Sequence, residues 1–158
     1  MITAIDIHYE GAVQIIRSRQ ARNRVLKLAF QELGREWGDD YLPDHFTRAG
    51  ARKYGYAERS RGYTARKRKQ HGHIQPLKFT GRLEEETRGF TVAPSTAGVK
   101  VRVPGRALNL TNIPNSQVNM REEISTVTPD ERRDLADYGM AFTEKLAQRV
   151  QGKTRRRI

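Results

Sequence analysis

The sequence predicts an α+β fold, with a small antiparallel β-sheet packed by a long N-terminal helix and a C-terminal helix. Two stretches with apolar residues at helical spacing and one stretch of alternating valines carry this prediction. At 158 residues the chain is long enough for one domain with a real core. We expect a single domain over 1–152, an extended basic arm at 47–75 with one helical turn around Tyr63–Lys69, and a flexible basic tail at 153–158.

The N-terminal part of the chain changes from strand-like to helix-like spacing. Ile5, Ile7 and Tyr9 alternate with polar residues, which predicts a short half-buried strand ending near Gly11. A helix is then expected from about residue 12 to residue 41. Its apolar stripe repeats every three or four residues and consists of Leu26, Phe30, Leu33, Trp37 and Tyr41. Core packing accounts for this stripe.

A β-hairpin and a second helix follow in the other half. Residues 86–92 and 99–103 are expected to pair as antiparallel strands, because Val99, Val101 and Val103 share one face after a turn. Residues 104–123 read as a loop, with Leu108, Leu110 and Ile113 as candidate anchors. The C-terminal helix is expected to begin at a Thr-Pro-Asp-Glu capping box, residues 128–131, and to end at Gly152. Its predicted apolar stripe comprises Leu135, Tyr138, Gly139, Phe142, Leu146 and Val150.

The positive charge of the chain is concentrated in two segments. The net charge is +12 at pH 7, and residues 48–73 carry nine Lys or Arg against one acid, Glu58. The last ten residues add five basic residues and no acid. Such a localised positive field predicts binding to a polyanion or to an acidic protein surface.

Tyrosines are interspersed among the cations of the basic arm, which leaves two interpretations open. Tyr and Arg are enriched at protein interfaces, and this favours an arm that contacts a neighbouring subunit. Tyrosines could also stack on bases while cations neutralise phosphates. We favour the interface, and its predicted residues are Tyr54, Tyr56, Arg59, Tyr63, Arg66, Lys67, Arg68 and Lys69. The tail residues predicted to contact DNA are Lys153, Arg155, Arg156 and Arg157.

The sequence gives little support for an enzyme, a cofactor or a metal site. Phosphate-binding glycine loops and hydrolase elbows are absent, and there is no cysteine. Three groups of residues were considered as metal ligands. The first two are better explained as solvated acids, and the third lacks a further ligand. They are Glu84–Glu86, the cluster Asp39, Asp40, Asp44 and His45, and the pair His71 and His73. Neither a signal-peptide pattern nor a membrane-length apolar run is present, so synthesis in the cytoplasm is expected.

A series of residues between His45 and Leu83 resembles a known family. It runs His45-Phe46, Tyr54-Gly-Tyr56-Ala-Glu-Arg59, Tyr63, Lys67, Gly72, Pro76-Leu77 and Thr80-Gly81-Arg-Leu83. This series resembles small tailed-bacteriophage morphogenesis proteins of the neck and tail-completion type. In that family a comparable "PL..TG.L" segment opens an antiparallel sheet between two helices.

The resemblance implies a structural protein of the virion that forms a ring at the head–tail junction or the proximal tail. Its implied partners are copies of itself, neighbouring neck and tail proteins, and double-stranded DNA in transient contact. The host cytoplasm would be its site of synthesis. The alternative is a free basic nucleic-acid-binding protein, which would bind DNA or RNA as a monomer with a steep dependence on salt.

Overall fold

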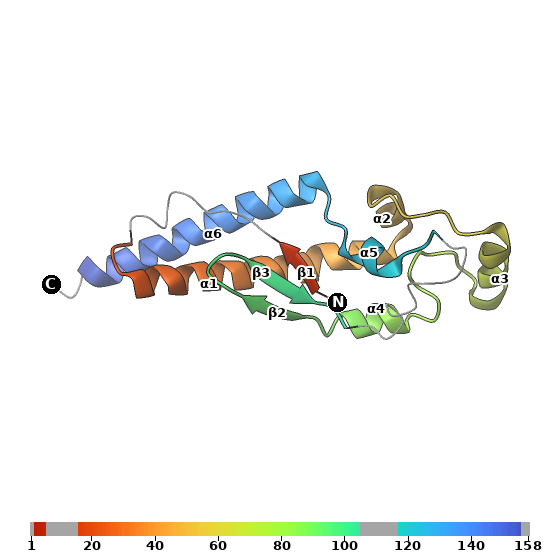
Figure 1. Ribbon diagram of the computed structural model, residues 1–158, viewed down its shortest axis with the longest axis horizontal. Coiled ribbons are helices and arrows are strands. Elements are labelled where there is room, and N and C mark those ends of the chain that lie inside the picture. The colour runs from red at the N-terminus through yellow and green to blue at the C-terminus, as the bar shows by residue number, and fades with distance from the viewer. Residues whose placement is uncertain (1, 6–15, 105–116, 156–158) are drawn as a thin grey trace. The chain divides into compact units, whose positions relative to one another are not determined.

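The computed structural model describes residues 2–5, 16–104 and 117–155, and it has the predicted α+β fold (Figure 1). The chain divides into two compact units that are each assembled from separated stretches. Unit 1 comprises Met1–Thr3, Gly38–Thr91 and Arg102–Thr128, and unit 2 comprises Ala4–Trp37, Val92–Val101 and Pro129–Ile158.

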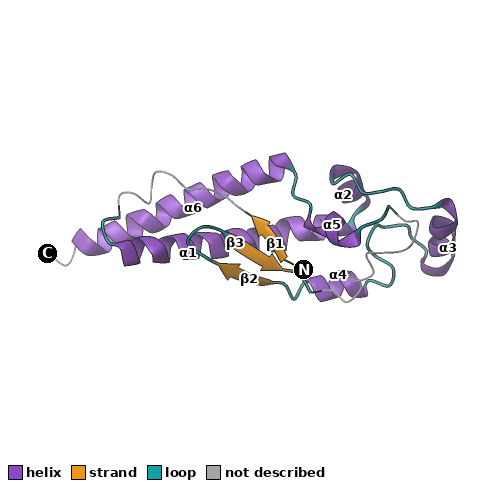
Figure 2. Ribbon diagram, viewed as in Figure 1, coloured by secondary structure: helices purple, strands orange, loops and turns teal. Residues whose placement is uncertain are grey.

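Helices dominate the described residues, and the strands form one small sheet (Figure 2). The strands are β1 (Ile2–Ile5), β2 (Thr91–Pro94) and β3 (Val99–Arg102), in the order β1-β3-β2. The α-helices are α1 (Arg19–Glu36), α2 (Arg48–Lys53), α3 (Arg61–His71), α4 (Arg82–Thr87), α5 (Met120–Ser125) and α6 (Pro129–Arg155). A π-helical turn (Trp37–Tyr41) and a 3₁₀ helix (Leu42–Phe46) follow α1.

Unit 2 is built on two long helices, α1 and α6, that lie side by side (Figure 1). Ser18 caps α1 by accepting a hydrogen bond from the amide of Ala21 at 3.4 Å, so the helix begins later than the predicted residue 12. The predicted stripe is largely confirmed, since the buried hydrophobic residues of α1 and the following turn are Val25, Ala29, Phe30, Leu33 and Trp37. Apolar burial therefore holds this helix in place.

The hairpin of unit 2 packs closely against α1 at Gly34. A Cβ built on Gly34 would lie 2.6 Å from a methyl of Val92 and 2.8 Å from a methyl of Val99. Real Cβ atoms do not approach other carbons so closely, so the absence of a side chain at this position lets the hairpin approach the helix. The alternating valines of β3 are buried as predicted.

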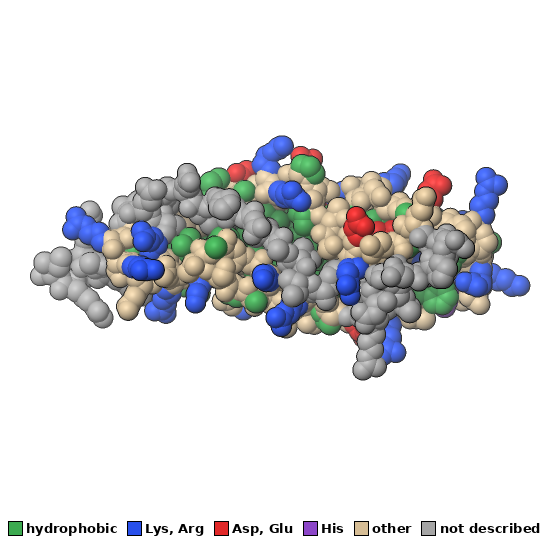
Figure 3. Space-filling view, viewed as in Figure 1, with side chains coloured by type: hydrophobic (Ala, Val, Ile, Leu, Met, Phe, Trp, Pro, Cys, Tyr) green, Lys and Arg blue, Asp and Glu red, His purple; other side chains and the backbone are tan. Residues whose placement is uncertain are grey.

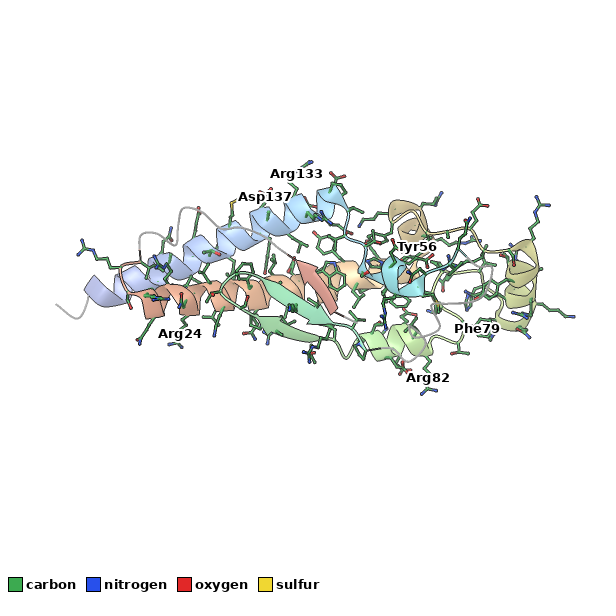
Figure 4. The ribbon with its side chains drawn as sticks, viewed as in Figure 1. Arg24, Tyr56, Phe79, Arg82, Arg133 and Asp137 are labelled. Carbon is green, nitrogen blue, oxygen red and sulfur yellow. The ribbon has the colours of Figure 1, made fainter. Side chains whose placement is uncertain are left out.

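The buried face of α6 is lined by smaller side chains than predicted. Its buried residues recur every four positions and are Glu131, Leu135, Gly139, Thr143 and Ala147. Phe142 and Leu146, expected at its centre, are only half-buried. Small residues on a helix face permit a close approach of the neighbouring helix, and Ala147 packs in one cluster with Ile16 and Val25. Arg133 and Asp137 project from the outer side of α6 (Figure 4).

Unit 1 combines short helices with a small core. Its buried apolar residues include Leu42, Phe46, Leu77, Leu83 and Ile124. Within it, the described residues of the predicted 104–123 loop include the start of α5, where Asn119 accepts a hydrogen bond from the amide of Glu122 at 3.2 Å. The predicted anchors Leu108, Leu110 and Ile113 lie outside the described residues, as do Ile7 and Tyr9.

The prediction of an extended arm at 47–75 is wrong in its secondary structure, because the segment contains α2 and α3. The side chains of Thr47 and Ser60 accept hydrogen bonds from the amides of Gly50 at 2.8 Å and Tyr63 at 3.3 Å. These two caps start the helices. Neither helix has a strong apolar stripe, so the periodicity of the sequence did not indicate them.

The strand predicted at 86–92 is also corrected, because α4 occupies its first residues and β2 begins at Thr91. The "PL..TG.L" segment therefore leads into a short helix before the sheet. Gly81 precedes α4 with a φ of 87°, a backbone conformation that favours glycine. Leu77 has a positive φ of 52° and a buried side chain, so tertiary packing holds its backbone in a sparsely populated region.

The C-terminal helix begins at Pro129 as predicted but extends past the predicted end at Gly152 to Arg155. A glycine inside a helix costs only about 1 kcal/mol relative to alanine, and so does not by itself end one. The predicted flexible tail therefore includes residues that continue the helix, and Arg156 and Arg157 lie outside the described residues.

Candidate partner interface on unit 1

Helix α3 of unit 1 carries four exposed cations. This helix contains no acidic residue, and its exposed basic side chains are Arg61, Arg66, Arg68 and Lys69. Blue side chains stand out from the surface at its position in Figure 3. Of these cations, Arg66, Arg68 and Lys69 were predicted as interface residues. Their side chains extend into solvent, where they can contact a negatively charged surface.

Lys67 differs from its neighbours on α3, because its side chain is only 4% exposed. Its Nζ donates a hydrogen bond to the backbone carbonyl of Gln75 and lies 5.7 Å from the centre of the Tyr63 ring. Burial, followed by repulsion from Arg59, lowers the pKa of Lys67. This predicted interface residue therefore ties α3 to the segment that follows it.

Arg59 is held inside unit 1 by an ion pair with Glu123. Two guanidinium nitrogens donate to the two carboxylate oxygens at 2.6 and 2.5 Å, and the Glu123 side chain is 8% exposed. In a third hydrogen bond, Arg59 donates to the carbonyl of Ala57 at 2.5 Å. This bidentate ion pair fixes the segment between α2 and α3 against α5. The Arg59 guanidinium, predicted to contact a partner, is therefore engaged inside unit 1.

The tyrosines after α2 take part in an aromatic cluster around the buried His45. The His45 and Tyr54 rings stack with their centres 3.7 Å apart, and the Tyr56 hydroxyl bonds Nδ1 of His45 at 2.6 Å. Lys53 lies over the rings of Tyr41 and Tyr54, at 5.6 and 5.1 Å from their centres. Tyr54 is thus a core residue of unit 1, and Tyr56 is anchored beside it (Figure 4).

Tyr63 and Phe79 form a more accessible aromatic group at α3. Their ring centres are 6.4 Å apart, and His71 packs edge-on against Phe79 at 4.2 Å. Phe79 is 41% exposed and Tyr63 is half-buried. Of the predicted interface tyrosines, Tyr63 therefore belongs to the surface where the exposed cations lie.

The acids and histidines considered as metal ligands have other partners or lie apart. Asp44 pairs with Lys53 at 3.2 Å, and Glu84 pairs with Lys78 at 2.6 Å. The rings of His71 and His73 are 6.2 Å apart. Within the part of the chain that the structure describes, no three His, Asp or Glu residues gather as a metal site would require. In the same residues, no helix is long and apolar enough to span a membrane.

The tail residues proposed for DNA contact are placed only in part. Lys153 and Arg155 belong to the last turns of α6, and Arg156 and Arg157 are outside the described residues. Sequence reasoning missed Glu123, whose role depends on Arg59, far away in the chain. It also missed Arg48, which begins α2 and lines a cavity of unit 1. Thr47 is a recognisable N-cap and could have placed Arg48 at the start of a helix, whereas no local signal indicated Glu123.

Comparisons of this chain with protein-family models, with curated proteins and with solved structures find no match.

Proposed function

We propose that this chain is a structural subunit of a tailed-phage virion that forms a ring at the neck or the proximal tail. The proposal takes its family from the resemblance of residues 45–83, and it takes its docking surface from unit 1. We assign no catalytic role and no cofactor. In this role the protein assembles in the host cytoplasm and then stays in the virion around the DNA channel.

The observation that carries the docking role is the inward placement of Tyr54 and Tyr56. Stacking on bases requires exposed rings, but Tyr54 packs on His45 and Tyr56 is bonded to it. Tyr54 and Tyr56 are thereby unavailable as stacking platforms, which leaves Tyr63 and Phe79 as the accessible rings beside the α3 cations. A charged, folded surface of this kind suits an acidic protein neighbour.

Assembly of the purified protein tests the ring. We expect negative-stain images to show closed rings of uniform diameter, and light scattering to give a mass that is a fixed multiple of the 18.2 kDa chain. A monomer at every accessible concentration, also when the proteins encoded beside it are added, contradicts the proposal.

Charge removal tests the docking surface separately. The variant Arg61→Gln, Arg66→Gln, Lys69→Gln removes three exposed cations from α3, and we expect it to lose a co-purifying neighbour while unit 2 stays folded. The matched control Arg19→Gln, Arg24→Gln, Lys27→Gln removes three exposed cations from α1 in unit 2. Equal loss of the neighbour in both variants would mean that net charge, and not the α3 surface, governs docking.

Free nucleic-acid binding is retained as the second candidate because α3 carries exposed cations and no acid. A contact made only with phosphates is independent of sequence and weakens steeply with salt.

DNA contact by the C-terminal tail is tested separately. Replacing Arg155, Arg156 and Arg157 by Gln should flatten the slope of log K for duplex DNA binding against log salt by up to about 2.7, at about 0.9 per phosphate contact. An unchanged slope removes DNA contact at the tail from the proposal.

A further inference from the structure

Unit 1 contains a cavity of about 320 Å³ between the start of α2 and the end of α3. Its lining residues are Arg48, Arg68, Gly72, His73, Ile74 and Gln75. The two arginines come from different helices, and the other four residues form the chain immediately after α3. This volume is at the lower end of the range typical of small-molecule sites, and it is large enough to admit an amino-acid side chain.

The polar groups around the cavity are positive or neutral. None of its lining residues is acidic, and neither Arg48 nor Arg68 has an ion-pair partner among the described residues. The Nδ1 atom of His73 is shielded from solvent and, in the same part of the chain, has no hydrogen-bond partner. Two planar guanidinium groups and an unsatisfied imidazole nitrogen together favour an oxyanion.

The electrostatic environment of His73 agrees with an anion site. Desolvation, followed by the charges of Lys67, His71 and Lys78, lowers the pKa of this imidazole. Lys78 is itself paired with Glu84 at 2.6 Å. A bound anion would offset these surrounding positive charges.

The wall of the cavity after α3 is fixed by contacts that do not involve the two arginines. Lys67 donates to the carbonyl of Gln75, and His71 packs on Phe79. Because the chain on both sides of His73 is anchored in this way, the backbone wall is already formed before any ligand binds. A ligand then has to order only the exposed arginine side chains, which limits the entropy that binding costs.

We propose that this cavity binds the carboxylate of a glutamate or aspartate in an acidic segment of a protein partner. The inference rests on the proposed function, because it assumes that unit 1 meets a protein neighbour. In this site the Arg48 and Arg68 guanidinium groups bind the carboxylate oxygens, and Ile74 contacts the methylene groups of the entering side chain. The remaining α3 cations attract the other acids of the segment.

A carboxylate fits this cavity better than the phosphate of duplex DNA. Each DNA phosphate is a diester held between two sugars on the surface of a stiff double helix, so it cannot project into a recess. An acidic side chain projects from a flexible segment and can enter. Arginine forks match carboxylate geometry with two parallel hydrogen bonds.

The test measures binding of a capped peptide of alternating Glu and Gly residues to the full chain by calorimetry at physiological ionic strength. We expect Arg48→Gln, Arg68→Gln to weaken peptide binding by about tenfold or more, as for the loss of a charge-assisted pair. The control Arg19→Gln, Arg24→Gln removes the same charge from exposed positions on α1 in unit 2, and we expect less than about threefold weakening from it.

A second measurement follows His73 directly by NMR titration of its ring protons. Addition of the peptide should raise the pKa of His73, because a nearby negative charge stabilises the imidazolium. Arg48→Gln, Arg68→Gln should abolish that change, whereas Arg19→Gln, Arg24→Gln should preserve it. No change in the His73 titration at a saturating peptide concentration overturns the proposal.

Two other outcomes also overturn it. Equal weakening by the two double variants would mean that the peptide senses net charge alone. Selective weakening of binding to a duplex DNA of random sequence by Arg48→Gln, Arg68→Gln, with the peptide unaffected, would assign the site to phosphate. The result is independent of ring formation: rings without peptide binding contradict only this inference, and peptide binding without rings contradicts only the proposed function.

Discussion

Unit 2 and unit 1 are stabilised by different kinds of interaction. In unit 2 apolar side chains such as Leu33, Trp37 and Leu135 are fully buried, and the helices pack through an apolar core. In unit 1 the buried set includes His45, Lys67 and Glu123, which are held by specific polar partners. Apolar packing tolerates small adjustments, but a buried polar group depends on one particular partner.

This difference indicates that the partner-binding surface lies on unit 1. The polar contacts of unit 1 cost desolvation and contribute less net stability than apolar packing of similar volume would. In return they fix the tyrosines inside and leave the cations of α3 and the cavity arginines free to meet a partner. We regard unit 2, whose two long helices pack through an apolar core, as the scaffold of the protein.

The largest effect is expected from truncating the core of unit 2. Trp37→Ala removes a side chain that is 0% exposed, and the loss of burial together with the cavity left behind should destabilise the protein by about 3–5 kcal/mol. Urea unfolding followed by circular dichroism measures this change. The control Leu28→Ala on α1 truncates a side chain that is 41% exposed, and it should stay within about 0.5 kcal/mol of wild type. Similar losses in both variants would contradict the assignment of the core.

The next effect sharpens the contrast, because it removes charge from unit 1. Arg59→Ala leaves the buried Glu123 carboxylate without its bidentate partner, and we expect a loss of about 3 kcal/mol. The double variant Arg59→Met, Glu123→Leu should recover most of that loss, since no unpaired charge remains. Hydrogen exchange should locate the change in α5 and in the segment before α3. Additive losses in the double variant would mean that the ion pair has no special role.

A smaller effect is expected at the edge of the unit 2 core. Phe142 is half-buried beside Tyr138, with the two ring centres 6.4 Å apart. Phe142→Ala should therefore cost about 1–2 kcal/mol, below the about 3–5 kcal/mol of a fully buried aromatic residue. The same urea titration measures it. A loss as large as that of Trp37→Ala would show that the helix face is buried more deeply than the structure indicates.

The smallest effect concerns Tyr138 in unit 2 and the dependence of stability on pH. Burial, followed by the charges of Glu36 and Glu32, raises the pKa of Tyr138 to about 12 from 10.0. The unfolded chain therefore loses this proton first, and the stabilising contribution of Tyr138 falls as pH rises from about 10 to about 12. Absorbance titration of phenolate should show that Tyr138→Phe removes the tyrosine that ionises at the highest pH. It should also flatten the decline of stability in that range. If the variant instead removes a tyrosine that ionises near pH 10, the Tyr138 environment is wrongly described.

The main elements of unit 2 could be predicted from the sequence. Phe30, Leu33 and Trp37 of the predicted stripe and the valines of β3 are buried, because burial of one face imposes a period on the residues that form it, whereas Leu26 and Tyr41 are only half-buried. The Thr128-Pro129 start of α6 was equally readable, since a capping signal acts within one helical turn. In the basic segment, one helical turn around Tyr63–Lys69 was predicted, and α3 contains it. The full length of α3 and the whole of α2 were missed because their apolar content is low, although Thr47 and Ser60 provided caps.

Which polar residues of unit 1 are exposed and which are buried depends on tertiary contacts. Arg59 and Glu123 lie 64 residues apart in the sequence, and nothing local to either one indicates the other. In α3, Lys67 and Arg68 are adjacent, yet Lys67 is buried and donates to the carbonyl of Gln75, whereas Arg68 lines the cavity. Periodic patterns record burial along a single element, whereas pairing of polar groups depends on elements that folding brings together from distant parts of the chain.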